Sequence, residues 1–144
     1  MDVSDLRKRI LQALDTARKD AASRRTVVDD ASRAFVQFID AVAAPLMLQA
    51  QAVLRAEHQP FTVHHPIGSV RLVSDNSADT FLEFTIDTSG ARPQVIGRVS
   101  LTRGRQSVVV LERPISTTKA IADLTEDDVA QFLVTEIPKL VVKP

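Results

Sequence analysis

The stretch TVVDDASRAFVQFIDAVAAPLMLQAQAVLRAEHQ, residues 26–59, decides the fold of this chain. It holds no glycine, and its apolar residues recur at helical spacing, so it predicts one long helix. Five apolar residues step by 3, 4, 3 and 4 positions, which is the heptad spacing of a coiled-coil seam. This candidate self-association seam consists of Val28, Ala31, Phe35, Phe38 and Val42.

The spacing of apolar residues changes after Val42, where the steps become 4, 4 and 3. Such a stutter locally unwinds a supercoil. Pro45 lies at the change and removes one backbone hydrogen bond, so both features predict a kink near Pro45. Further apolar residues lie off the seam, which predicts a helix covered on two sides. A sheet would cover one side, and another helix or a second copy of the chain would cover the other.

A shorter helix is predicted ahead of this stretch, over residues 4–20, with Ser4 as its N-cap. Residues 21–25 are the expected turn, and Thr26 followed by Asp29 fits a capping box that would open the second helix. The sequence therefore predicts a helical hairpin. No glycine or proline enforces the turn, so a continuous helix is the alternative. One narrow apolar stripe marks the first helix: Leu6, Ile10, Leu14 and Ala17.

Glycine and proline gather between residues 60 and 114, and this part predicts an antiparallel meander of four or five strands. Gly97 in the middle of a strand indicates a bulge or a close backbone approach. Val108–Leu111 is apolar on both faces, which predicts a central strand or one covered on its second face. The predicted strands are 61–65, 69–74, 80–88, 94–102 and 106–113, with one turn at Arg103–Gly104.

Residues 115–144 predict a loop and then a C-terminal helix packed on the sheet. Thr125 and Asp128 fit a capping box, Leu124 with Val129 fits a hydrophobic staple, and Pro138 should end or bend this helix. The fold class is therefore α+β. We expect a single domain over residues 1–144, made of a helical arm (1–59), an antiparallel sheet (60–114) and the loop with the C-terminal helix (115–144).

Charge and composition exclude several function classes. The chain has 18 basic and 18 acidic residues, so its formal net charge is zero and no long-range field steers a charged partner. It has no cysteine, which excludes disulfides and thiolate chemistry and fits a cytoplasmic location. Asp40 and three glutamines interrupt the long apolar run, so we expect no membrane span.

Motifs for chemistry are missing from the sequence. There is no P-loop, dinucleotide fingerprint or G-x-S-x-G motif, so we predict no catalytic residue, no cofactor and no metal, and lean against an enzyme. His64 and His65 are neighbours on a predicted strand and point to opposite faces, so they cannot share one metal. Glu83 should pair across strands with Arg71, Arg98 or Arg113.

These observations favour a non-catalytic interaction module that self-associates through the seam, with a homodimer favoured and a protein partner left open. The alternative is a small-molecule-binding protein with a pocket between the helices and the sheet. Its candidate ligand-facing groups are His64, His65, Arg71 and Arg98. A third and least favoured hypothesis is nucleic-acid binding through the basic first helix, where Arg7–Arg9 are consecutive cations with acids nearby.

Overall fold

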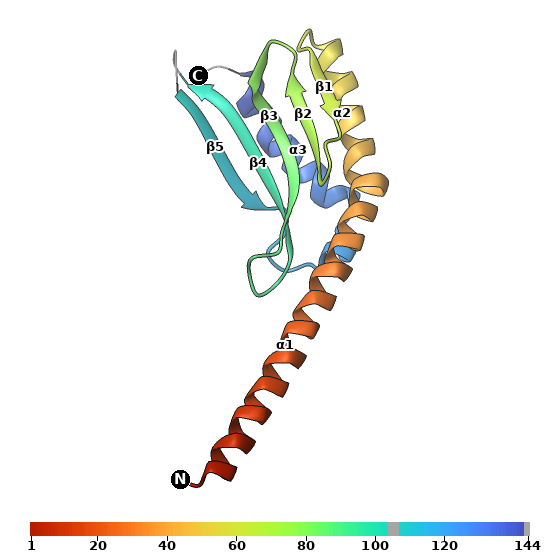
Figure 1. Cartoon of the computed structure of the whole chain (residues 1–144). Helices are drawn as coiled ribbons and strands as arrows, with labels where there is room; N and C mark the ends of the chain where they lie inside the picture. Colours follow the sequence, from red (N-terminus) through yellow and green to blue (C-terminus); the bar gives the residue numbers. More distant parts are fainter. Residues whose placement is uncertain (104–106, 143–144) are drawn as a thin grey trace.

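The computed structural model describes residues 1–103 and 107–142. The fold is α+β, as predicted: a long N-terminal helix, a five-stranded antiparallel sheet and a C-terminal helix (Figure 1). The elements are α1 (Val3–Phe38), the π-helical η1 (Ile39–Ala43), α2 (Ala44–Ala56), β1 (Phe61–His64), β2 (Ser69–Ser74), β3 (Ser77–Asp87), β4 (Gln94–Arg103), β5 (Ser107–Pro114), the 3-10 turn η2 (Ile121–Asp123) and α3 (Glu126–Val141).

The N-terminal helical hairpin is not formed. Residues 21–25, the predicted turn, are helical, and α1 runs unbroken to Phe38. Thr26 does not cap a new helix, because its hydroxyl donates to the carbonyl of Ala22, 3.1 Å away, as in a helix interior. The cap of the whole helix is Asp2 rather than Ser4: the Asp2 side chain accepts from the Ser4 N–H. Without glycine or proline to stop it, the good helix formers between the two expected helices simply continue the helix.

The segment before Pro45 is a π-helical turn rather than a break. In η1 the Ala44 N–H donates to the carbonyl of Ile39, five residues back. Proline has no N–H to donate, and Pro45 lies in the first turn of α2, where that donor is not needed. The predicted kink near Pro45 is not confirmed, and the irregularity that the structure shows ahead of Pro45 is the π-helical turn η1.

The sheet has the strand order β1-β2-β3-β4-β5, and every neighbouring pair is antiparallel. The predicted meander is thus confirmed with five strands. A register shift between Val73 and Ser74 marks an irregularity in β2 near its turn to β3. The turn predicted at Arg103–Gly104 lies partly outside the described residues.

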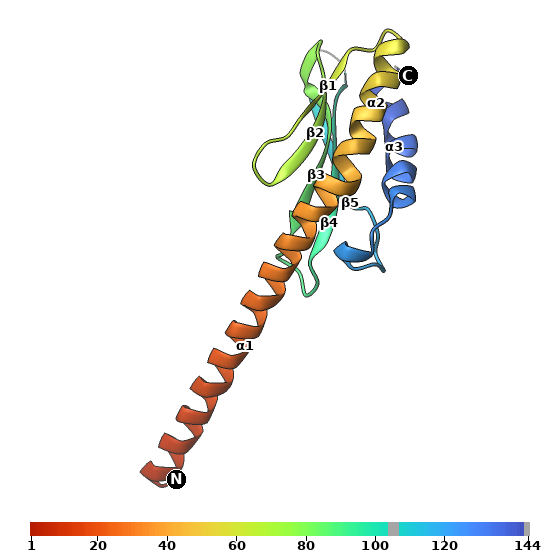
Figure 2. The same cartoon turned by 90° about the vertical axis from the view of Figure 1, so that its right-hand side faces the viewer.

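Both α2 and α3 lie on one face of the sheet, and the other face is open (Figure 2). Along the β1 edge, α2 supplies hydrogen bonds: Gln51 Oε1 accepts from the Val63 N–H at 2.8 Å, and Arg55 Nε donates to the Phe61 carbonyl at 3.1 Å. β5 forms the opposite edge, and three of its apolar side chains are 44–48% exposed: Val108, Val110 and Leu111. The prediction that this strand is central or covered is therefore wrong for the described part of the chain.

The start of α3 is predicted correctly. Thr125 and Asp128 form the capping box, and the staple residues Leu124 and Val129 are both buried. Pro138 does not end the helix, since α3 continues to Val141. The proline lies close enough to the C-terminus that few backbone hydrogen bonds depend on it.

Three phenylalanines from three different elements meet at the centre of the core. The ring of Phe84 on β3 lies 6.2 Å from that of Phe38 on α1 and 5.4 Å from that of Phe132 on α3, both in edge-to-face geometry. This arrangement suits the quadrupoles of aromatic rings. The contact of α3 with the sheet through Phe132 confirms the predicted packing of the C-terminal helix.

Candidate functional site

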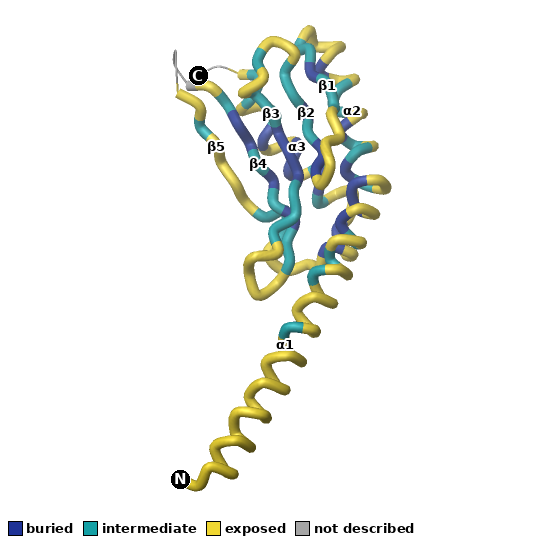
Figure 3. The backbone as a smooth tube through the Cα atoms, viewed as in Figure 1, coloured by how far each residue is buried: buried dark blue, intermediate teal, exposed yellow. Residues whose placement is uncertain are grey.

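The N-terminal part of α1 is a helical arm that leaves the rest of the fold. From Val3 to Asp30, every residue except Ala21 and Val28 is exposed (Figure 3). At 1.5 Å per residue this arm is about 42 Å long. Four of its large apolar side chains are 44–55% exposed: Leu6, Ile10, Leu11 and Leu14. The arm thus presents an apolar stripe with no partner among the described residues.

Because α1 is continuous, the stripe of the arm and the predicted seam belong to one face. The alternating steps of 4 and 3 residues continue from Val28 back to Val3. Most positions of this series are apolar, but two of them hold arginine, Arg7 and Arg24. A heptad pattern of this length is typical of a helix that packs along another helix. We call the apolar residues of this face within the arm, together with Leu6 at its flank, the arm stripe: Val3, Leu6, Ile10, Leu14, Ala17, Ala21 and Val28.

The structure divides the predicted seam residues between two environments. Phe35 and Phe38 are 3% and 4% exposed and belong to the chain's own core. Their rings stack at 6.2 Å, and the C-terminal part of α1 contacts η2. Ala31 and Val42 are half-buried at the rim of this core, and Val28, within the arm, is half-buried as well.

The open face of the sheet carries a row of polar residues that crosses all five strands. Cross-strand register aligns His64 with Arg71, Arg71 with Glu83, Glu83 with Arg98, and Arg98 with Glu112. Three of the four candidate ligand-facing groups are therefore brought together in this row. The fourth, His65, follows the end of β1 and is exposed.

Glu83 is the centre of this row, and it is only 3% exposed. Arg71 donates to one carboxylate oxygen at 2.6 and 2.8 Å, and Arg98 contacts the other at 3.3 Å. The predicted pairing of Glu83 with Arg71 and Arg98 is confirmed. The Arg71 guanidinium also lies 4.3 Å from the centre of the Phe81 ring, a cation–π contact. The two arginines are thus engaged with neighbours within the sheet.

Arg98 has a second acidic neighbour, although the contact is imperfect. Its Nε lies 2.9 Å from Glu112 Oε1, yet this buried nitrogen makes no hydrogen bond. A buried donor without a partner carries an energetic cost, and Glu112 is more than half exposed. The outer end of the row is therefore held less firmly than its centre.

A second ionic cluster on the helix-covered face was missed by the sequence interpretation. Glu136 of α3 is 4% exposed and pairs with Arg113 at 3.0 Å and with Lys139 at 3.2 Å. Arg113 also lies 4.3 Å from the centre of the Phe132 ring. In the sheet register Arg113 aligns with Gly97 and not with Glu83, which places it on the helix-covered face, and no local sequence signal fixes this register.

A shallow cleft of about 250 Å³ lies beside this cluster, between β4–β5 and α3. Its polar lining includes Arg113, Glu136 and Lys139, whose charges already pair with one another. None of the four candidate ligand-facing groups lines it. The cleft and the predicted ligand-facing residues are therefore on different faces of the sheet.

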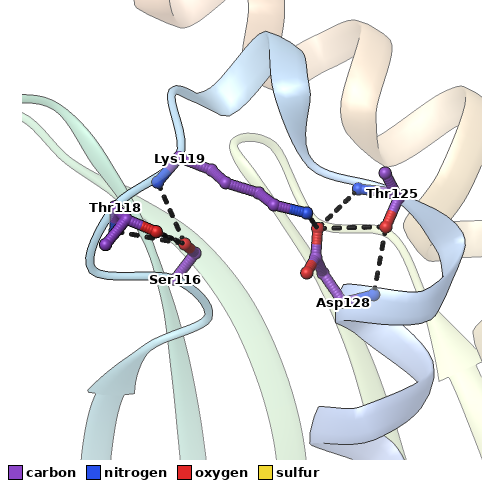
Figure 4. A network of polar contacts seen from close by, with 5 residues as sticks. All are labelled: Ser116, Thr118, Lys119, Thr125 and Asp128. Atoms are coloured by element: carbon purple, nitrogen blue, oxygen red, sulfur yellow. Dashed lines mark hydrogen bonds and ion pairs between the residues drawn. The ribbon is translucent and has the colours of Figure 1, made fainter.

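The loop before α3 is fastened by a polar network (Figure 4). Asp128 accepts hydrogen bonds from Lys119 Nζ at 2.8 Å and from the Thr125 N–H at 2.9 Å. The Lys119 ammonium, followed by the Thr125 N–H, lowers the pKa of the Asp128 carboxyl below its ordinary value. Ser116 Oγ in turn accepts from the Lys119 N–H at 3.0 Å. This network fixes how α3 begins and is structural in character.

We next asked whether the described residues could bind a metal ion or cross a membrane. No cluster of His, Cys, Asp and Glu suited to a metal ion occurs among them. The helix Val3–Ala56 satisfies the length and composition of a membrane span, with an 18-residue window of mean hydropathy 1.3 that is 28% buried. Core helices of globular proteins satisfy the same criterion, so this is weak evidence. The helix packs six side chains into the core: Phe35, Phe38, Ile39, Ala43, Met47 and Leu54.

Comparisons with protein-family models, with curated proteins and with solved structures give no match.

Proposed function

We propose that this chain is a self-associating interaction module, and that the arm stripe is the surface through which two copies meet. The observation that carries the proposal is the exposure of apolar side chains along the arm stripe, which spans about 38 Å of helix from Val3 to Val28 and is interrupted by Arg7 and Arg24. Most of the stability of a protein helix comes from packing its apolar face. Here the face of the arm lacks a neighbour among the described residues, so a partner helix would supply the missing contact.

This proposal moves the contact surface relative to the one expected from sequence. Phe35 and Phe38 are already buried in their own core, so they are occupied in each copy. The same heptad face continues into the arm, where Ile10 and Leu14 are 50% and 44% exposed. Burial of such side chains is favourable by about 25 cal/mol per Å² of apolar surface. A dimer remains the favoured assembly, because two-fold pairing is the commonest symmetry among oligomers.

The proposal assigns binding rather than catalysis to this chain. The charged groups of the sheet are engaged with each other, as Glu83 is with Arg71 and Arg98. Glu136 is likewise held by Arg113 and Lys139. Groups satisfied in this way support the fold and are poorly placed to activate a substrate.

The test is the mass of the full chain in solution, measured by size exclusion with light scattering at tens of micromolar. We expect a dimer for the natural sequence and a monomer for Ile10→Glu/Leu14→Glu. The matched control is Gln12→Glu/Thr26→Glu, which adds acidic side chains at exposed positions on the opposite side of the helix. Circular dichroism should show a folded chain in each case. A strict monomer for the natural sequence would contradict the proposal, as would equal loss of the dimer in both variants.

A further inference from the structure

The folded part of the chain lies on the same side of the helix as the arm stripe. At 3.6 residues per turn, Ile10 and Val28 are five turns apart, and Phe35 falls about 20° from them around the axis. Phe35 is buried against the chain's own core, whereas Ile10 is half exposed. The face that would meet a partner arm is thus, a few turns later, the side of the helix that contacts η2 and, through Phe38, reaches Phe84 of the sheet.

This placement restricts how two arms can pair. In a parallel pair with equal register, both folded parts would lie at the same end and on the side between the helices, where they would compete for one space. In an antiparallel pair they lie at opposite ends. We infer that two copies of this chain pair their arms antiparallel; this rests on the proposed function, since it concerns the same surface.

The length of the arm sets the register. The arm is free from Val3 to Val28, and Ala31 is the first residue packed against the core. The longest overlap that avoids collision with the partner's core places Val3 opposite Val28 of the second copy. Residues that face each other then have numbers that sum to 31.

In this register, large side chains face small ones along the arm stripe. Ile10 lies opposite the second copy's Ala21, and Leu14 lies opposite its Ala17. Alternation of large and small residues lets facing layers interdigitate. At the flank, Leu6 lies beside the second copy's Val27, and these two side chains are 48% and 50% exposed in the single chain. Equal register in parallel would instead pair alanine with alanine at positions 17 and 21.

One pair of facing residues brings like charges together and disfavours the antiparallel pairing. Arg7 lies opposite the second copy's Arg24, and both side chains are exposed. Arginine can lay its apolar stem along the neighbouring helix and keep its charge in water, which reduces the repulsion. Because the same layer occurs twice in a symmetric dimer, a single substitution at Arg24 changes two contacts.

The absence of cysteine from the sequence allows a direct test by disulfide formation. Full chains carrying Ile10→Cys and Ala21→Cys, with tags of different mass, are mixed and oxidised. We expect the mixed disulfide to dominate and each variant alone to cross-link poorly. In the antiparallel register, position 10 of one copy is eleven residues, or about 16 Å along the axis, from position 10 of the other, and the same holds for position 21. A disulfide requires Cα atoms within about 7 Å.

Efficient cross-linking of Ile10→Cys with itself would overturn the antiparallel arrangement. If neither combination forms a disulfide while the natural chain is a dimer, the inferred register is wrong but self-association stands. A monomeric natural chain would instead remove the proposed function as well. The outcomes for the orientation and for self-association are therefore distinguishable.

A second measurement avoids any change to the apolar layers. In the antiparallel register, Arg24→Glu places an acid opposite Arg7 twice, and we expect the dimer dissociation constant to fall about tenfold. In a parallel pair of equal register, the same substitution would place the two introduced acids against each other and would not tighten the dimer. Arg25→Glu is the control, with the same charge change beside the layer. Equal tightening by both substitutions would contradict the register.

Discussion

Gly97 of β4 lies directly against the ring of Phe132 of α3: a Cβ at position 97 would lie 2.1 Å from Phe132 Cζ. The contact explains why a glycine occurs in the middle of a strand, where it otherwise weakens the sheet. The sequence predicted a bulge or a close approach at this residue, and the structure shows the close approach. It is through this contact that α3 is seated on the sheet.

Gly97→Ala should therefore destabilise the chain, because the methyl group overlaps a ring fixed in the core. Overpacking of this kind typically costs about 1–3 kcal/mol in the free energy of unfolding. Urea titration followed by circular dichroism measures it. Gly90→Ala is the matched control: its nearest neighbour, the Arg92 carbonyl oxygen, is 3.9 Å away, so stability should not fall. Equal stability of both variants would show that α3 can shift without cost.

Glu83→Gln tests the charged row on the open face. The substitution leaves Arg71 and Arg98 facing a neutral amide in a site where Glu83 is almost fully buried. Both arginines are about one-third exposed, so solvent screens part of the lost ion-pair energy. We therefore expect the unfolding free energy to fall by about 2 kcal/mol. Glu112→Gln, at an exposed carboxylate of the same row, should change the unfolding free energy by less than about 0.5 kcal/mol. Comparable losses at the two positions would contradict the central role of Glu83.

Features that depend on residues close together in the sequence could be predicted, whereas contacts between residues far apart in the sequence could not. The capping box of Thr125 and Asp128, the meander of strands and the close approach at Gly97 are local patterns, and each was predicted. The turn at residues 21–25 was wrong because only capping signals suggested it, and nothing nearby stops a helix. No local pattern shows that Gln51 bonds to the edge of β1, or that Arg113 reaches Glu136, since these partners are far apart in sequence.

The candidate site shows the same limit. Heptad spacing indicated that one face of the long helix is buried, but spacing carries no information about which partner covers it. The structure covers Phe35 and Phe38 with the chain's own core and leaves Ile10 and Leu14 free. Likewise, pairing of Glu83 with arginines on adjacent strands followed from alternation, whereas the choice among three arginines needed the register of β5.

Phe38→Ala separates core packing from self-association. Phe38 is 4% exposed and its ring contacts Phe84, so the truncation should cost about 3–5 kcal/mol in unfolding free energy. Val36→Ala, at a side chain that is 58% exposed two residues away, should change it by less than about 0.5 kcal/mol. Thermal unfolding of both variants measures the difference. If the Phe38→Ala chain lost the dimer but kept its folding stability, the contact between copies would involve the seam predicted from the sequence and not only the arm stripe.

Asp128 gives the prediction for pH dependence. Its pKa is lowered in the folded chain by Lys119 and by the Thr125 N–H, from an ordinary value of 3.8. A depressed pKa contributes stability above the unfolded value, and this contribution is lost as the pH falls through the folded value. Asp128→Asn should therefore destabilise the chain at pH 7, lowering the free energy of unfolding by about 1 kcal/mol because the helix cap is weakened. The difference from the natural chain should shrink only as the pH falls below 3.8 and through the lowered pKa of Asp128, where its carboxyl becomes protonated and, like the asparagine amide, uncharged. Urea unfolding at pH 7 and pH 3 measures the two differences, with Asp127→Asn, which lies outside the network, as the control. A difference that stayed constant across this range would show that the charge of Asp128 is not what holds Lys119 and the start of α3 together.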